Sequence, residues 1–153
     1  MPVPRWPTVL LLTPLLLACS EVRNSTGMVS KRIGEVVHSP GAVELDLRKL
    51  TSFGWEYFYA TKPGLSREEV CELINAGRST CGRIIRIGKA PDDHVYLLFG
   101  QAGNLTHVEL HAVKNGVFDV QFIDGGYPKD KAVFRIRRSP SSGEADSVLL
   151  EPK

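Results

Sequence analysis

Short runs rich in apolar residues, separated by turn-forming residues, fill the second half of the chain. Runs of this kind are typical of β-strands, and the runs on either side of Asn115-Gly116 alternate apolar and polar residues, as half-buried strands do. The loops between the runs are short and contain Gly, Asn, Asp or Pro. This spacing predicts an antiparallel meander. The five runs lie at residues 83–87, 95–99, 105–114, 117–123 and 132–137.

Two earlier segments also favour strands. Residues 43–48 alternate apolar and charged side chains, and residues 55–59 are rich in aromatic side chains, which are enriched in strands. Between two of the later runs, Asn115-Gly116 provides two residues that tolerate positive φ, as a type I′ hairpin turn requires. We therefore expect a hairpin at this point, joining the runs on either side.

One helix is expected, beginning at Ser66. Ser66 and Glu69 have the spacing of a capping box, in which the serine oxygen accepts a backbone N–H and the glutamate reaches back. Apolar residues then recur at helical spacing, and Gly77 is expected to end the helix. A helix of about three turns is stable only when it is packed, so it must lie on the sheet. The predicted fold class is α+β: an antiparallel β-meander sheet with one short helix packed on one face.

Composition and charge limit the classes of function. The chain has 153 residues, of which 42% are hydrophobic and 24% are charged, as in an ordinary single-domain globular protein. The 19 Lys and Arg residues nearly balance the 17 Asp and Glu residues. This is far from the concentrated positive charge with which proteins bind nucleic acid, so no nucleic-acid partner is expected.

The N-terminus has the pattern of an export signal. Arg5 supplies a positive charge, residues 6–17 are mostly apolar, and small residues follow. The apolar stretch is shorter than the roughly 20 residues that a membrane-spanning helix needs. We therefore expect it to be removed rather than to remain as an anchor.

The end of this segment, Leu16-Leu17-Ala18-Cys19, resembles the lipobox of bacterial lipoproteins. The resemblance implies cleavage before Cys19 and acylation of that cysteine, which would anchor the chain in membrane lipid. Ser20 resembles the sorting pattern for the outer membrane, so the periplasmic face of that membrane is the expected location. An ordinary secretory signal is the alternative. The expected organisation is a signal peptide at residues 1–18, the acylated cysteine and a tether at 19–41, and a single α+β domain at 42–153.

Acylation of Cys19 would leave Cys71 and Cys81 as an even pair. In an oxidising compartment such a pair usually forms a disulfide, which here would join the helix to the start of the next strand. Two buried free thiols, or a nucleophilic cysteine, are the alternatives.

The segment most typical of a metal site is His107, Glu109 and His111, since alternation places all three on one face of a strand. The first and last of these positions are about 13 Å apart on a strand, too far to share one ion. Only Glu109 with one histidine could chelate, with further ligands from His94 or Asp92-Asp93. The alternative is a solvated polar face.

A group of cations on and beside the last run could hold lipid phosphates or an acidic partner. A solvated face balanced by carboxylates is the alternative. The residues concerned are Lys131, Arg135, Arg137 and Arg138.

Two stretches resemble the BamE (SmpA/OmlA) family, small outer-membrane lipoproteins of the β-barrel assembly machinery. Residues 64–70, followed by Leu73 and Ile74, resemble the helix opening of the family, and residues 95–106 resemble its strand, turn and strand. The helix lacks the G-x-P closure that the family carries. The resemblance implies an outer-membrane location and a role in assembly.

No sequence motif of a hydrolase, metalloprotease or nucleotide-binding site occurs. We therefore expect a non-enzymatic binding or scaffold module of the envelope with a protein partner and no cofactor, and the family resemblance implies envelope or β-barrel assembly as its role. A periplasmic inhibitor or immunity protein that blocks an enzyme, and a metal-binding domain, are the alternatives.

Overall fold

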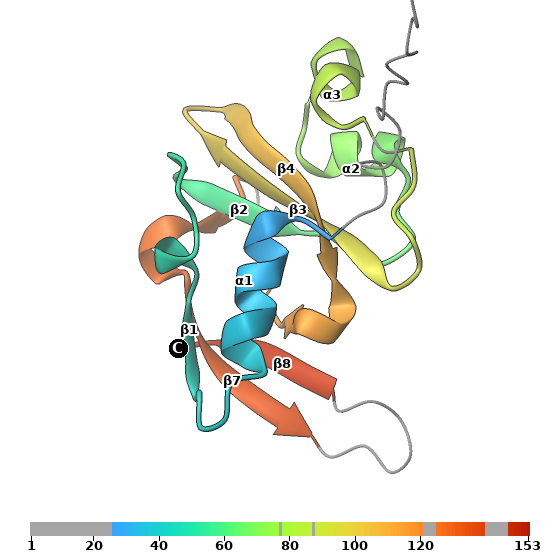
Figure 1. Ribbon diagram of the computed structural model, residues 1–153. Helices are drawn as coiled ribbons and strands as arrows, with labels where there is room; N and C mark the ends of the chain where they lie inside the picture. Colours follow the sequence, from blue (N-terminus) through green and yellow to red (C-terminus); the bar gives the residue numbers. More distant parts are fainter. Residues whose placement is uncertain (1–25, 77, 87, 121–124, 140–146) are drawn as a thin grey trace, which may run out of the picture.

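The computed structural model describes residues 26–76, 78–86, 88–120, 125–139 and 147–153. The expected signal peptide and Cys19 lie outside these residues. The α+β class is confirmed, with three helices and eight strands among the described residues (Figure 1). The helices are α1 (Met28–Val37), α2 (Arg67–Leu73) and α3 (Arg78–Ile84). The strands are β1 (Glu44–Asp46), β2 (Tyr57–Ala60), β3 (His94–Gln101), β4 (Asn104–Ala112), β5 (Val117–Phe118), β6 (Tyr127–Pro128), β7 (Val133–Ser139) and β8 (Ser147–Pro152).

The strands form two sheets where the sequence predicted one meander. One sheet has the order β4-β3-β2-β6 and is antiparallel throughout. The other has the order β1-β7-β8-β5, in which β5 pairs with β8 in parallel and the other pairs are antiparallel. The chain passes between the two sheets several times: β1 lies in the second sheet, β2 to β4 in the first, β5 in the second, β6 in the first, and β7 and β8 in the second.

Strand β3 is the centre of the molecule, because both of its faces are covered. Tyr96 and Leu98 belong to a core cluster shared with α2 and α3. Leu97 and Phe99 belong to a second cluster, which they share with α1 and with strands of the other sheet. The fold therefore has α2 and α3 on one face of the β3 sheet, and α1 with the second sheet on the other face (Figure 1).

Helix α1 corrects the expectation of a tether over residues 19–41. Val29, Ile33 and Val37 recur every four residues on one side of the helix, and all three are buried in the core. Lys31 and Glu35 are exposed on the outside. The folded domain therefore begins well before residue 42, and the tether is wrong for residues 28–37. None of the described helices is long and apolar enough to cross a membrane.

The capping box predicted for α2 is confirmed. The Ser66 hydroxyl accepts the N–H of Glu69, and the Glu69 carboxylate accepts the N–H of Ser66 at 2.7 Å. The helix ends in a Schellman motif, in which Asn75 takes φ +50° and the N–H of Ala76 reaches the carbonyl of Cys71. Asn75 thus occupies the left-handed position, and Gly77, expected there, lies outside the described residues.

The strand expected at residues 83–87 is wrong, because α3 runs to Ile84 and no strand follows at residues 85 and 86. Cys81 and Ile85 lie one helical turn apart and are both buried against the sheet, whereas Ile84 is 37% exposed. Cys81 lies at disulfide distance from Cys71, with Cα atoms 5.8 Å apart. The pair therefore joins α2 to α3, and not α2 to a strand.

The hairpin expected at Asn115-Gly116 is also wrong. Asn115 ends the short 3-10 helix η3 (Val113–Asn115) and is buried, while Gly116 takes φ +114° and leads away to β5. The type I′ geometry occurs instead between β3 and β4, where Ala102 and Gly103 have φ +49° and +76°. Asn115-Gly116 therefore forms no hairpin, and the turn between β3 and β4 is made by Ala102-Gly103 instead.

Candidate functional site

The three residues expected on one face of β4 do face the same way, but that face is not solvated. Glu109 is 8% exposed and His111 is 1% exposed. The first half of α1 lies over them, so the solvated-face interpretation is wrong.

The Glu109 carboxylate binds the N-terminus of α1. Its Oε1 accepts the N–H of Ser30 at 2.7 Å, and its Oε2 accepts the N–H of Val29 at 3.2 Å. These N–H groups belong to the first turn of the helix, which leaves its N–H groups without intrahelical partners and carries partial positive charge. Residue 27, before the helix, is a glycine, and a Cβ there would overlap the Glu109 side chain. A strand residue thus takes the role usually played by a capping side chain.

His107 holds Glu109 from the outer side. Its Nε2 lies 2.7 Å from Oε2 of Glu109, and because the carboxylate only accepts, Nε2 carries the proton. The imidazole stacks on the ring of Phe53, with centroids 4.4 Å apart and planes 28° apart. The carboxylate is therefore held by two backbone N–H groups and one ring nitrogen.

Ser30 joins α1 to the end of β4. Its Oγ accepts the N–H of Ala112 and the side-chain amide of Asn115, each at 3.1 Å. The same Asn115 amide nitrogen donates to the Ser30 carbonyl at 2.9 Å. Gly34, one turn further along α1, permits this approach, because a Cβ at Gly34 would lie 2.6 Å from Oδ1 of Asn115.

His111 is held as one neutral tautomer within this network. Its Nε2 lies 2.7 Å from the carbonyl oxygen of Gly116, which can only accept, so Nε2 carries the proton. Nδ1 lies 2.9 Å from Oγ of Ser30 and accepts its hydroxyl proton. Burial lowers the pKa of His111, and outweighs the bond to Gly116, which acts in the opposite direction.

This arrangement corrects the metal interpretation of His107, Glu109 and His111. Both nitrogens of His111 are hydrogen-bonded, and both carboxylate oxygens of Glu109 face the helix N-terminus. His94, a suggested further ligand, contacts Asp93 and Thr26 instead. Within the described ranges, no group of three or more His, Cys, Asp or Glu side chains could hold a metal ion.

The four cations of the expected basic patch have different environments. Arg138 donates to the carbonyls of Val37 and Ala42, at 2.7 and 2.8 Å, and so binds the C-terminal end of α1, where cations are favourable. Arg137 pairs with Glu151 at 3.1 Å across the β7–β8 ladder. Lys131 and Arg135 are exposed. Arg138 therefore has a structural role, and the patch is reduced to the remaining three.

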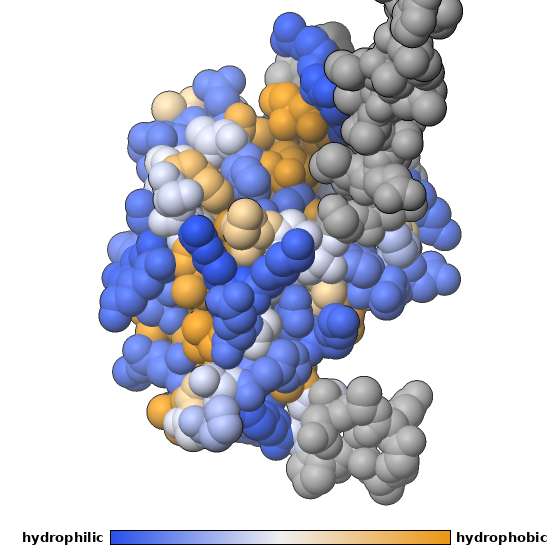
Figure 2. Space-filling model, viewed as in Figure 1, coloured by the Kyte–Doolittle hydropathy of each residue, from blue (hydrophilic) through white to orange (hydrophobic). Residues whose placement is uncertain are grey.

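A separate apolar area lies beside α2, α3 and the β3–β4 hairpin. Figure 2 shows hydrophobic surface gathered near this end of a mostly hydrophilic face. Leu73 is 47% exposed and Ile84 is 37% exposed. Between the helices and the hairpin is a cleft of about 240 Å³, lined among others by Tyr57, Ile74 and Leu105.

The residues missed at the sequence level are Gly27, Ser30, Gly34 and Asn115. Gly27, Ser30 and Gly34 lie in the expected tether, and Asn115 lies in the expected hairpin turn. The usable signal was the spacing of Val29, Ile33 and Val37, with Ser30 and Gly34 on the adjacent side of the same helical face. Small residues at that spacing permit close packing of a helix.

No protein-family model, curated protein or solved structure matches the chain.

Proposed function

We propose that the mature protein is a lipoprotein of the bacterial envelope, anchored through acylated Cys19 at the periplasmic face of the outer membrane. Its domain then acts as a non-enzymatic binding or scaffold module for a protein partner. The lipobox-like Leu16-Leu17-Ala18-Cys19 supports the anchor. The Cys71 and Cys81 pair at disulfide distance is consistent with an oxidising compartment.

The non-enzymatic part of the proposal rests on the hydrogen bonds that Glu109 and His111 make. A buried carboxylate and a buried imidazole on one strand are the residue types most typical of acid–base catalysis. Here their hydrogen bonds go to the backbone of α1, to Ser30 and to Gly116. Their role is to hold α1 on the sheet, which supports a domain built for binding.

The short connection to the anchor places the domain close to lipid in this proposal. Thr26, the first described residue, follows Cys19 by only seven positions, and α1 begins two residues later. A fully extended chain of that length spans at most about 25 Å. The domain would therefore work near the membrane surface, where an assembly factor meets its membrane-bound partners.

A pull-down separates the two protein-binding classes. Acylated protein captured from detergent-solubilised envelope should retrieve outer-membrane assembly proteins if the module belongs to that machinery. A retrieved hydrolase whose activity falls when the domain is added would favour the inhibitor class instead. The Cys19→Ala variant is the matched control, because its folded domain has the same sequence and it lacks the anchor.

A further inference from the structure

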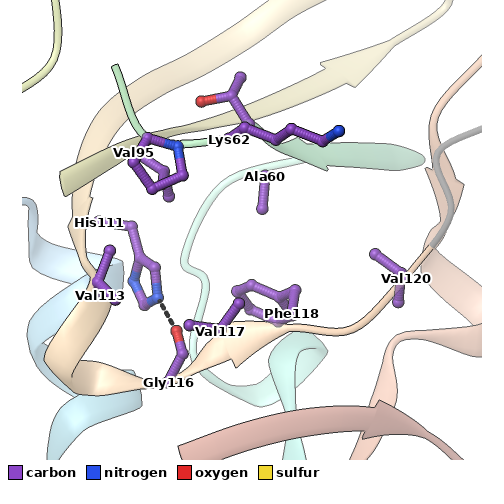
Figure 3. Close-up of a pocket in the computed structure, with 11 residues that line it drawn as sticks. Ala60, Lys62, Val95, His111, Val113, Gly116, Val117, Phe118 and Val120 are labelled. Atoms are coloured by element: carbon purple, nitrogen blue, oxygen red, sulfur yellow. Dashed lines mark hydrogen bonds between the residues drawn. The ribbon is translucent and has the colours of Figure 1, made fainter. Parts of the chain in front are cut away.

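An apolar cavity of about 290 Å³ lies between strands of the two sheets and adjoins the polar network under α1 at His111. Its walls come from separate elements: Ala60 from the end of β2, Val95 from β3, Val113 from η3, Val117 and Phe118 from β5, and Val120 beyond β5. Figure 3 shows these side chains surrounding the space, with His111 at one side. Its mouth is marked by exposed residues, among them Lys62, Pro63 and Val117.

The polar groups of the cavity are few and lie at its edge. The two nitrogens of His111 are already hydrogen-bonded to Ser30 and Gly116, so the imidazole presents an apolar ring to the space. Thr61 is buried, and its hydroxyl accepts the N–H of Tyr96. Lys62 is exposed and runs along the rim above Ala60 (Figure 3). The site thus combines apolar walls with one cation at the mouth.

We propose that this cavity binds a medium-chain fatty acid, with the aliphatic chain inside and the carboxylate at Lys62. Ligand sites in proteins are mostly apolar with a few polar groups that fix orientation, which describes this cavity. A cation at the rim attracts an anionic head group and repels a cationic one. The proposal concerns the folded domain alone and does not depend on acylation of Cys19.

The size of the cavity limits the ligand to one short chain. A dry apolar cavity of about 150 Å³ accepts benzene, with its six carbon atoms. The cavity here has about twice that volume, so it has room for roughly a dozen non-hydrogen atoms. Decanoate has about that size, whereas a phospholipid with two long chains does not fit.

Calorimetric titration tests the proposal on the mature chain, residues 19–153, carrying Cys19→Ser so that no detergent competes. Sodium decanoate is the probe, below its micelle concentration. Affinity should rise about fourfold for each added CH₂ from hexanoate to decanoate, and then level off as the cavity fills. Decanol should bind more weakly than decanoate, and decyltrimethylammonium more weakly still.

Two variants connect binding to the cavity. Ala60→Phe fills it and should abolish binding, provided that its circular dichroism spectrum and melting temperature show a folded protein. Lys62→Glu alters only an exposed side chain. It should lower the affinity for decanoate about three- to tenfold, since an exposed charge pair contributes only modestly to binding. Lys31→Glu, an equal change of charge on the outer face of α1, should leave the affinity unchanged.

The outcomes separate the possible occupants. Absence of decanoate binding, or equal binding of decanoate and decyltrimethylammonium that is insensitive to Lys62→Glu, overturns the proposal. Binding only to vesicles of anionic phospholipid, and not to free decanoate, would assign the surface to a membrane instead. Decanoate binding by folded Ala60→Phe would place the ligand elsewhere and also reject this site.

Discussion

Oε1 of Glu109 lies 2.7 Å from the backbone nitrogen of Ser30, and this contact joins strand β4 to the first turn of helix α1. A buried carboxylate is costly unless it is fully hydrogen-bonded. Here the helix N-terminus and His107 provide the partners. The same contact therefore stabilises the charge and fixes the position of α1.

Replacement of Glu109 by Gln should destabilise the domain. The amide cannot accept from both N–H groups, so one donor of α1 loses its partner at a cost of about 1–3 kcal/mol. Urea unfolding followed by circular dichroism measures the change. Glu35→Gln, on the exposed side of the same helix, is the control and should shift the midpoint by little. Equal urea midpoints for Glu109→Gln and Glu35→Gln would mean that Glu109 does not stabilise the packing of α1.

Replacement of Gly34 by Ala should also destabilise the domain, although alanine has the higher helix propensity. Propensity alone favours alanine by about 1 kcal/mol. The added Cβ would lie 2.6 Å from Oδ1 of Asn115, so either the amide or the helix must move. We expect a net loss of about 1–3 kcal/mol in the free energy of unfolding. A stabilised Gly34→Ala variant would contradict the close contact between α1 and η3.

Acid should weaken the fold through His111. Because burial lowers its pKa, the folded state keeps the ring neutral while the unfolded chain binds a proton below about pH 6.5. The stabilisation that depends on neutral His111 is therefore fully present above about pH 6.5. It is lost as the pH falls towards the lower pKa that His111 has in the folded state. The slope reaches at most about 1.4 kcal/mol per pH unit.

Urea midpoints measured between pH 7.5 and 5 test this dependence. His111→Gln should be less stable than the wild type at pH 7.5, yet should lose less stability on acidification. Glu109 and His94 are the charged neighbours that act on His111, and both remain in the variant. An unchanged pH dependence in His111→Gln would assign the effect to other histidines.

The Cys71–Cys81 pair should be oxidised in the mature protein. A peptide map without reduction should contain the joined peptides, and alkylation of both thiols without prior reduction would exclude the bridge. The double Ser variant should lose about 2.8 kcal/mol by the loop-entropy model for a loop of 11 residues. The loss should be concentrated in α2 and α3, which hydrogen exchange can resolve.

Substitution of Cys19 by Ala should release the protein from the membrane fraction. Several acyl chains, at about 0.8 kcal/mol per buried CH₂, account for stable anchoring. Incorporation of labelled palmitate and fractionation of the envelope are the measurements. Equal palmitate incorporation into wild type and variant would refute the lipobox interpretation.

Local signals in the sequence predicted the elements whose contacts are local. The capping box of Ser66 and Glu69 lies within four residues, and the alternation in β4 depends only on the period of a strand. In these cases the partners are near each other in the chain, so their geometry follows from spacing alone.

Only the tertiary structure decided the roles of Ser30, Asn115, Glu109 and His111. In sequence, Asn115-Gly116 is a strong hairpin signal and Glu109 with its two histidines resembles a metal site. The contacts that determine their roles connect residues about 80 positions apart, such as Asn115 with Ser30 and Glu109 with Val29. A buried polar group takes whichever partner the packed core brings to it, because leaving it unpaired costs more than any local preference contributes. Spacing along the chain cannot reveal that partner.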